Sequence, residues 1–117
     1  MQRFQLSCMM LCVSLLAFGA QAADCMQIRF APGASSVEIR GEAPPNDVLC
    51  YEMRTGGGQD ARIRVLEGRN TFVSVEGVAD AQTDSSFTTE PRTYRLRVGQ
   101  LMRAARPEAF RLLVSVK

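Results

Sequence analysis

The sequence contains no histidine, and this absence excludes several kinds of chemistry. No Ser–His or Cys–His catalytic pair can form without histidine, and no histidine-based metal site is available. The carboxylates in strand-like segments fall at solvent-facing positions or at strand ends, where charged side chains ordinarily lie, so they indicate no paired acid and base. We therefore predict a protein that is not an enzyme and that has no catalytic residues, no metal and no cofactor.

Lysine is almost as scarce, because Lys117 is the only one and the other basic residues are arginines. The glycines at 56–58 therefore have no lysine of a phosphate-binding loop beside them, and they lack a following helix, so we interpret them as a hairpin connection. Arginine suits bidentate contacts with carboxylates and phosphates, and it keeps its charge when buried. The arginines are thus suited to bind an acidic partner.

The amino terminus carries the one long apolar run of the chain. Arg3 precedes an apolar stretch over residues 6–18, and the small-x-small pattern at residues 20–22 follows it. This pattern predicts a signal peptide over residues 1–22, cleaved after Ala22, and the run is too short for a comfortable membrane span. We expect a single domain over residues 23–117, located in the periplasm and with no membrane attachment after cleavage; an uncleaved anchor is the alternative.

Two cysteines remain after residue 22, namely Cys25 and Cys50. An even pair in an exported chain favours a disulfide bond. The alternative, a metal or redox pair, has little support because the sequence contains neither a CxxC motif nor a histidine.

The charge of the predicted mature chain is divided along the sequence. Residues 23–91 hold six arginines and eleven acidic residues, whereas residues 92–117 hold seven basic residues and one glutamate. This division indicates an acidic partner for the C-terminal part. Nucleic acid is a poor candidate, since the chain is exported and lacks a basic motif with interleaved aromatics. The alternative is that no partner is involved, and that the basic strands lie beside the acidic strands within the fold.

Most of the chain alternates between apolar and polar residues, which is the pattern of half-buried strands. Turn residues separate the segments, and no helical period is convincing. The pattern predicts an all-β fold, a small antiparallel β-sandwich or barrel of about seven to eight strands. The polar segment 78–91 is predicted to be a surface loop, with a short strand near Phe87. The seven clear strands are 25–31, 35–42, 48–54, 61–67, 70–77, 92–99 and 108–117.

The stretch "YRLRVGQLMRAARPE" (94–108) begins as a strand and then leaves the alternating pattern. Arg95 and Arg97 fall on its outer face, opposite an apolar face that feeds the core. Residues 99–107 are predicted to form a loop that displays Arg103 and Arg106 and is closed by a proline. We expect these two arginines to bind a partner, with Arg97 as a supporting neighbour.

Two long segments, 28–67 and 94–116, resemble the bacterial periplasmic inhibitors of goose-type lysozyme. The residues that carry the likeness are Phe30, Gly33 and Ser36 in the first strand region, Tyr51 in the third strand, Gly58-Gln59 in the following turn, and Tyr94–Val98 with Ala105-Arg106. Departures are a methionine, Met102, where the family pattern has an arginine, the displaced Arg103, and a short middle section.

The resemblance implies a periplasmic β-sandwich that inserts a loop into the acidic cleft of a lysozyme, and hence a protein partner. On this basis the partner-binding residues are Arg103, Arg106, Arg97 and Tyr51, although periodicity also places Tyr51 on the core face. Inhibition of invertebrate-type lysozyme stays open. Two other functions also stay open: an immunity protein against a peptidoglycan-degrading toxin, and an envelope accessory domain that binds peptidoglycan or lipid. Edge strands leave a homodimer open as well.

Overall fold

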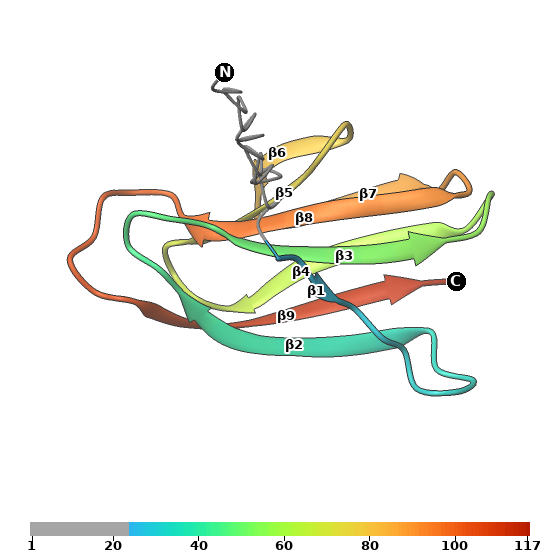
Figure 1. The fold of residues 1–117 in the computed structure, drawn as a ribbon, viewed down its shortest axis with the longest axis horizontal. Coiled ribbons are helices and arrows are strands. Elements are labelled where there is room, and N and C mark those ends of the chain that lie inside the picture. The colour runs from blue at the N-terminus through green and yellow to red at the C-terminus, as the bar shows by residue number, and fades with distance from the viewer. Residues whose placement is uncertain (1–23) are drawn as a thin grey trace, which may run out of the picture.

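A computed structural model describes residues 24–117, so the predicted signal peptide (1–22) lies outside the described residues. The described chain folds into two β-sheets that pack face to face (Figure 1). Nowhere in residues 24–117 is there a helix with the length and hydrophobicity needed to cross a bilayer. The nine strands are β1 (Met26–Gln27), β2 (Ser36–Ala43), β3 (Leu49–Thr55), β4 (Asp60–Glu67), β5 (Thr71–Val75), β6 (Ala79–Gln82), β7 (Asp84–Thr88), β8 (Arg92–Gln100) and β9 (Glu108–Val116).

The two sheets are separate, which makes the molecule a sandwich rather than a closed barrel. One sheet has the strand order β1-β3-β8-β5-β6, and the other has the order β2-β9-β4-β7. All strand pairs are antiparallel except β1 with β3, which is parallel. The last two strands of the chain, β8 and β9, each lie inside a sheet with a long neighbour on both sides. The predicted all-β antiparallel sandwich is confirmed.

Alternation along β8 and β9 fills the space between the sheets. Leu96 and Val98 of β8 and Leu112 and Val114 of β9 are completely buried. Side chains on successive residues of a strand point to opposite faces, so Arg97, between Leu96 and Val98, points to solvent. Each buried leucine or valine contributes about 1.5–3 kcal/mol relative to an exposed one. This core holds β8 and β9 rigidly, and therefore the ends of the loop between them.

The prediction of a surface loop over 78–91 is wrong for most of that segment, which contains β6 and β7. Both are edge strands, and an edge strand with one solvated face needs few apolar residues. The only large apolar side chain of β7 is Phe87, which packs against the core as the expected short strand there requires. A positive φ of 47° at Ala81 and a register shift between β5 and β6 make the pairing irregular. Such irregularities leave no simple period in the sequence.

The first predicted strand, 25–31, is also only partly regular. Pairing is confined to Met26–Gln27, although the amide of Ile28 still donates to the carbonyl of Glu52, at 2.8 Å. Ile28 and Phe30 pack against the core as expected, whereas Met26 is 63% exposed. The chain then crosses from one sheet to the other, which ends its ladder early.

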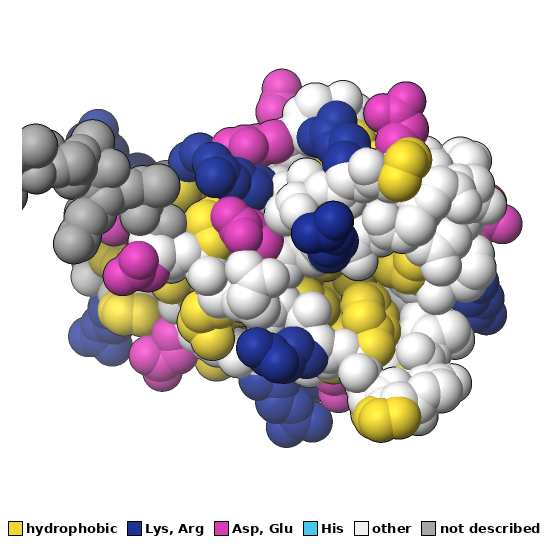
Figure 2. Space-filling model, turned by 45° about the vertical axis from the view of Figure 1, so that its right-hand side comes forward, with side chains coloured by type: hydrophobic (Ala, Val, Ile, Leu, Met, Phe, Trp, Pro, Cys, Tyr) yellow, Lys and Arg dark blue, Asp and Glu magenta, His cyan; other side chains and the backbone are white. Residues whose placement is uncertain are grey.

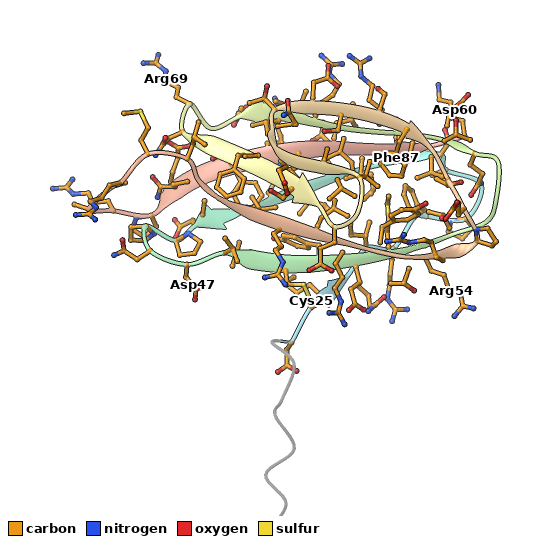
Figure 3. The ribbon with its side chains drawn as sticks, turned by 90° about the horizontal axis from the view of Figure 1, so that it is seen from above. Cys25, Asp47, Arg54, Asp60, Arg69 and Phe87 are labelled. Atoms are coloured by element: carbon orange, nitrogen blue, oxygen red, sulfur yellow. A yellow bond between two sulfur atoms is a disulfide. The ribbon has the colours of Figure 1, made fainter. Side chains whose placement is uncertain are left out.

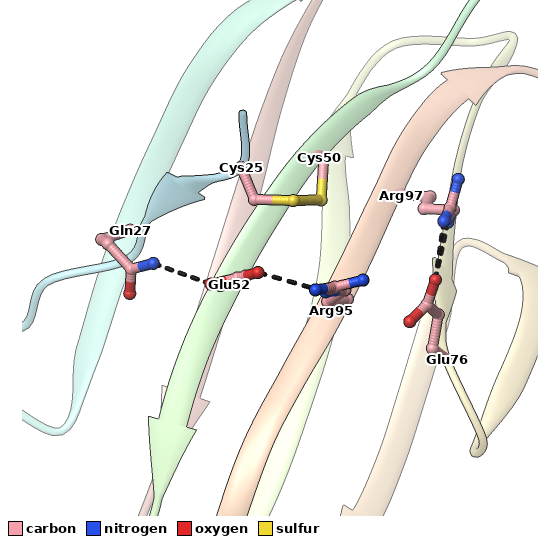
Figure 4. The surroundings of a disulfide bond; sticks show 7 residues. All are labelled: Cys25, Gln27, Cys50, Glu52, Glu76, Arg95 and Arg97. Atoms are coloured by element: carbon pink, nitrogen blue, oxygen red, sulfur yellow. Dashed lines mark hydrogen bonds and ion pairs between the residues drawn. A yellow bond between two sulfur atoms is a disulfide. The ribbon is translucent and has the colours of Figure 1, made fainter. Parts of the chain in front are cut away.

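The predicted disulfide between Cys25 and Cys50 is confirmed. It joins the residue before β1 to β3 on the outer face of the five-stranded sheet (Figure 4). The bond fastens the short parallel strand β1, which has only two paired residues, to the body of the sandwich.

Candidate protein-binding site

Residues 101–107 connect β8 to β9 and form a loop at one end of the sandwich (Figure 1). Arg103 and Arg106 are both exposed in it. Within residues 24–117 neither guanidinium forms an ion pair or a side-chain hydrogen bond. The structure therefore brings these two predicted residues together on one short loop and leaves both charges available.

The backbone of this loop is held by Asn70, which lies in the turn between β4 and β5. The amide of Met102 donates to Asn70 Oδ1 at 2.9 Å, and Asn70 Nδ2 donates to the carbonyl of Met102 at 2.8 Å. The amide of Leu101 donates to the backbone carbonyl of Asn70 at 2.8 Å. The side chain of Asn70 thus pairs with Met102 as an adjacent strand would.

Gln100, the last residue of β8, connects both ends of the loop. Its Nε2 donates to the carbonyl of Arg106 at 2.8 Å and to the carbonyl of Ala43 at 3.0 Å. Its Oε1 accepts from Asn70 Nδ2 at 3.1 Å. A loop whose two ends are fixed in this way loses less conformational entropy when it binds, which favours affinity.

A carboxylate fixes the turn that supports the loop. Glu108 Oε1 accepts hydrogen bonds from the amide of Asn70, at 2.9 Å, and from Thr71 Oγ1, at 2.6 Å. Asn70 is therefore itself positioned by the first residue of β9. The loop, the turn and the ends of β8 and β9 form one hydrogen-bonded unit.

Three exposed residues at this end were not identified from the sequence as candidates for binding. Leu101 and Met102 are 66% and 71% exposed, which is unusual for large apolar side chains. Arg69 is exposed in the turn next to Asn70, at the end of the molecule that also carries Asp47 (Figure 3). The break in alternation after Val98 could have indicated Leu101 and Met102. Nothing in the sequence could have indicated Arg69, because its place depends on pairing across about thirty residues.

The structure separates Arg97 from the loop arginines. Arg97 lies on the outer face of β8, and its guanidinium donates two hydrogen bonds to Glu76 Oε1, at 2.7 and 2.9 Å (Figure 4). On the same face Arg95 donates to Glu52 at 3.1 Å, and Glu52 also accepts from Gln27 at 2.8 Å. Both strand arginines already have carboxylate partners.

Tyr51 is only 4% exposed and belongs to the core. Burial raises the pKa of its phenol above the usual value. Of the two interpretations of Tyr51 in the sequence, the position on the core face is the one the structure shows, so its side chain supports the sandwich from within. It does not lie on the surface that carries the loop arginines.

The division of charge along the sequence largely disappears in the fold. Arg111 of β9 forms ion pairs with Glu38 at 3.2 Å and with Glu67 at 2.9 Å. Together with the two pairs on β8, this places three of the four strand arginines of the basic segment beside carboxylates of the acidic segment. Figure 2 shows basic and acidic side chains interspersed on one face. Among the described residues of the basic segment, Arg92, Arg103, Arg106 and Lys117 form no ion pair. The guanidinium of Arg92 lies 4.4 Å from the centroid of the Tyr94 ring and donates to the backbone carbonyl of Glu76.

Within residues 24–117 there is no group of three or more histidine, cysteine or acidic residues that could hold a metal ion. The fold and the loop together define a small β-sandwich that presents a rigid, arginine-bearing loop at one end. This arrangement is suited to contact with another macromolecule.

Solved structures with this fold include two periplasmic inhibitors of g-type lysozyme. PliG of Aeromonas hydrophila has a TM-score of 0.68 and 22% identity, with 80% of this chain and 96% of that one covered. PliG of Salmonella Typhimurium has a TM-score of 0.68 and 16% identity, with 82% and 100% covered. At such low identity the likeness shows the shared fold, and the resemblance noted in the sequence is confirmed at that level.

The pre-peptidase C-terminal domain of a Bacillus anthracis collagenase is also similar, with a TM-score of 0.52 and 13% identity, and 85% of this chain and 100% of that one covered. No protein-family model matches the sequence, and no curated protein sequence is similar to it. The architecture is thus shared by proteins with different roles, so function has to be argued from the loop.

Proposed function

We propose that this protein is a periplasmic inhibitor of a lysozyme, most specifically of the g-type, and that it acts by placing its β8–β9 loop in the active-site cleft. The observation that carries the proposal is the combination of the inhibitor fold with a preorganised loop bearing two unpaired arginines. The resemblance in sequence and the likeness in structure both point to the same family.

The chemistry of the target explains why arginine suits this task. Lysozymes cleave glycan with the help of carboxyl groups, one of which acts as the general acid. Arg103 and Arg106 would each donate charge-assisted hydrogen bonds to such carboxylates, and the planar guanidinium allows bidentate contacts. Inside a cleft from which water is excluded, these pairs set specificity and slow dissociation. The substrate would then be excluded by occupation of the cleft.

Leu101 and Met102 add an apolar contact beside the charged one. Energetically dominant contacts in protein interfaces combine buried apolar anchors with arginine, surrounded by a polar rim. The two exposed side chains precede Arg103 directly in the same loop. We propose that they pack against the wall of the cleft, and that Arg69 contacts its rim.

Arg97 remains a proposed contact of the rim, adjacent to the loop along β8 rather than part of it. Its ion pair with Glu76 is exposed, and such pairs contribute little to stability. Arg97 could therefore exchange partners at small cost. Tyr51 is not proposed as a contact, because its side chain lies in the core.

Location in the periplasm is part of the proposal. The predicted signal peptide over residues 1–22 would direct export, and a disulfide persists in an oxidising compartment. Mass spectrometry of the protein recovered from a periplasmic fraction tests this. We expect a chain that begins at Ala23 and contains one disulfide; an uncleaved chain in the membrane fraction would contradict it.

Lysozyme titration tests the function directly. Residues 23–117 are added to g-type, chicken-type and invertebrate-type lysozyme while clearing of cell walls is followed. We expect inhibition of the g-type enzyme, and we expect Arg103→Ala with Arg106→Ala to weaken it by about 30-fold or more, because truncating one member of a buried charge pair costs about 2–5 kcal/mol.

The matched control for this titration is Arg54→Ala, which removes an exposed arginine at the opposite end of the molecule (Figure 3). We expect this variant to inhibit as the unaltered protein does. Absence of inhibition of all three enzymes would reject the proposed function. Inhibition that survives the double substitution would reject the loop as the site while keeping the function.

An envelope accessory domain is the second candidate, and the likeness to the collagenase domain is the observation that favours it. Sedimentation with isolated peptidoglycan sacculi and with anionic lipid vesicles distinguishes the two. An inhibitor stays in the supernatant in both cases.

An immunity protein would use the same loop against a peptidoglycan-degrading toxin, and a toxin gene beside this one would favour that role.

A further inference from the structure

Strand β2 forms one border of the four-stranded sheet, and only one of its edges is paired (Figure 1). It pairs with β9 over all eight residues, and no strand within residues 24–117 pairs with its other edge. The other edge strands, β7, β6 and β1, have five, four and two residues. An open edge of this length is a template for pairing with another strand.

The register with β9 shows which backbone groups of β2 face outward. The amide of Val116 donates to the carbonyl of Ser35 at 2.8 Å, and these residues lie opposite each other if the ladder is continued by one step. In an antiparallel ladder hydrogen-bonded and non-hydrogen-bonded pairs alternate. Residues 37, 39, 41 and 43 therefore bond to β9, and the N–H and C=O groups of Ser36, Glu38, Arg40 and Glu42 point to the open side.

The charges of β2 select one register for pairing with a second copy. Pairing about a two-fold axis has to match outward-facing residues with each other. If Glu38 lay opposite Glu38, or Arg40 opposite Arg40, like charges would meet, which is destabilising. The register that lies between those two registers has its two-fold axis at Ile39. It puts Glu38 opposite Arg40 twice, and Glu42 opposite Ser36. This register pairs residues 36–42 of both copies, whereas the register that places Arg40 opposite Glu42 pairs less of β2.

A groove lies beside the open edge of β2. It could receive the inward-facing side chains of a strand from a second copy. It lies between the segment around β1 and β2, and its apolar lining comes mainly from Met26, Ile28, Val37, Ile39 and Tyr51. In the selected register Ile39 of each copy lies opposite Ile39 of the other, on the face that borders this groove. Pairing would thus cover Met26, which is 63% exposed in the single chain.

We propose that β2 pairs antiparallel with β2 of a second copy, with Glu38 opposite Arg40, so that the two four-stranded sheets form one continuous sheet. A closed two-fold contact of this kind buries the same edge on both copies. Because the paired strands run in opposite directions, the β8–β9 loops point to opposite ends of the dimer. Both loops stay free, and the dimer carries two binding sites.

Charge reversal with sedimentation equilibrium tests the register. Residues 23–117 are measured up to about 1 mM, where even a weak contact is half populated. We expect a dimer for the unaltered protein and monomers for Glu38→Arg and for Arg40→Glu, because each puts like charges opposite each other. An equimolar mixture of the two variants restores complementary pairs and is expected to dimerise.

Arg54→Glu, on the outer face of the other sheet, is the control and is expected to leave the dimer intact. An unaltered protein that stays monomeric overturns the proposal. So does a dimer that both single variants retain, because its contact then lies elsewhere. If circular dichroism shows that both variants are folded and their mixture still does not dimerise, the proposed register is wrong.

Amide exchange of the unaltered protein provides a second test that needs no substitution. The amides of Glu38, Arg40 and Glu42 are expected to exchange slowly at high protein concentration and to lose that protection on dilution. Those of Val37, Ile39 and Gly41 face β9 and are expected to remain protected throughout. Exchange of the outward amides that does not depend on concentration contradicts pairing through β2. Since the loops stay free, lysozyme inhibition by Glu38→Arg should be unchanged, which separates this proposal from the proposed function.

Discussion

The phenol of Tyr51 lies inside the sandwich, and burial raises its pKa because ionisation would place a charge in an apolar environment. At the scale of single residues this makes stability depend on alkaline pH. A group whose pKa is raised in the folded state binds its proton more tightly there than in the unfolded chain. Its contribution is fully present below the unfolded pKa of about 10 and is lost as the pH rises toward the folded pKa.

We therefore expect the free energy of unfolding to fall above about pH 10, and to fall less steeply in Tyr51→Phe. Urea unfolding between about pH 8 and pH 11 measures this, and the difference between the two proteins at each pH isolates the phenol of Tyr51. The two proteins should be similar in stability near pH 8. Parallel pH profiles for both would show that Tyr51 does not titrate differently in the folded state.

At the scale of elements, the strands could be predicted where each carried its own apolar face. The segments that became β8 and β9 show this, because Leu96 and Leu112 each belong to a run with an apolar residue at every second position. Strands β6 and β7 could not be predicted in the same way, since they are stabilised by neighbours rather than by their own apolar residues. Local pattern therefore predicted the inner strands and the edge strand β2, gave only a short strand near Phe87 for β7, and missed β6.

Within the candidate site, the sequence likewise predicted part of the loop's structure and not the rest. Departure from alternation predicted that residues 99–107 leave the sheet and expose Arg103 and Arg106. Residues 99–100 still belong to β8, so the loop begins at Leu101. The rigidity of the loop could not be predicted, because Asn70 and Gln100 reach the loop only after distant strands have paired. The face of Arg97 was predictable, but its partner, Glu76, depended on the order of strands in the sheet.

Asn70→Ala tests whether the rigidity of the loop matters for inhibition. The change removes three side-chain hydrogen bonds, two to Met102 and one to Gln100. We expect lysozyme inhibition to weaken by about tenfold, because the loop then has to be ordered on binding. Stability should fall by about 1–3 kcal/mol.

Asn46→Ala, in the exposed turn between β2 and β3, is the control and should change neither property. Inhibition constants and urea unfolding curves measure the two effects separately. If Asn70→Ala loses stability but inhibits as before, the anchoring hydrogen bonds serve the fold alone.

At the scale of the whole molecule, one covalent bond supplements a modest core. The disulfide closes a loop with a sequence separation of 25 residues. In the chain-entropy model we expect Cys25→Ser with Cys50→Ser to lower the free energy of unfolding by about 3 kcal/mol. Chemical unfolding under oxidising conditions measures this. An unchanged stability would show that β1 and the segment that follows it are held by packing alone.

The order of the strands has a consequence for how the chain is made. β8 supplies the antiparallel neighbour of both β3 and β5, and β9 supplies that of both β2 and β4. A growing chain that ends before residue 92 therefore lacks the central strand of each sheet. Because domains fold as units, neither sheet can form until the last residues of the sandwich have been synthesised. We therefore expect the polypeptide to stay unfolded while it is being made, which would suit passage through a secretory channel in the proposed export.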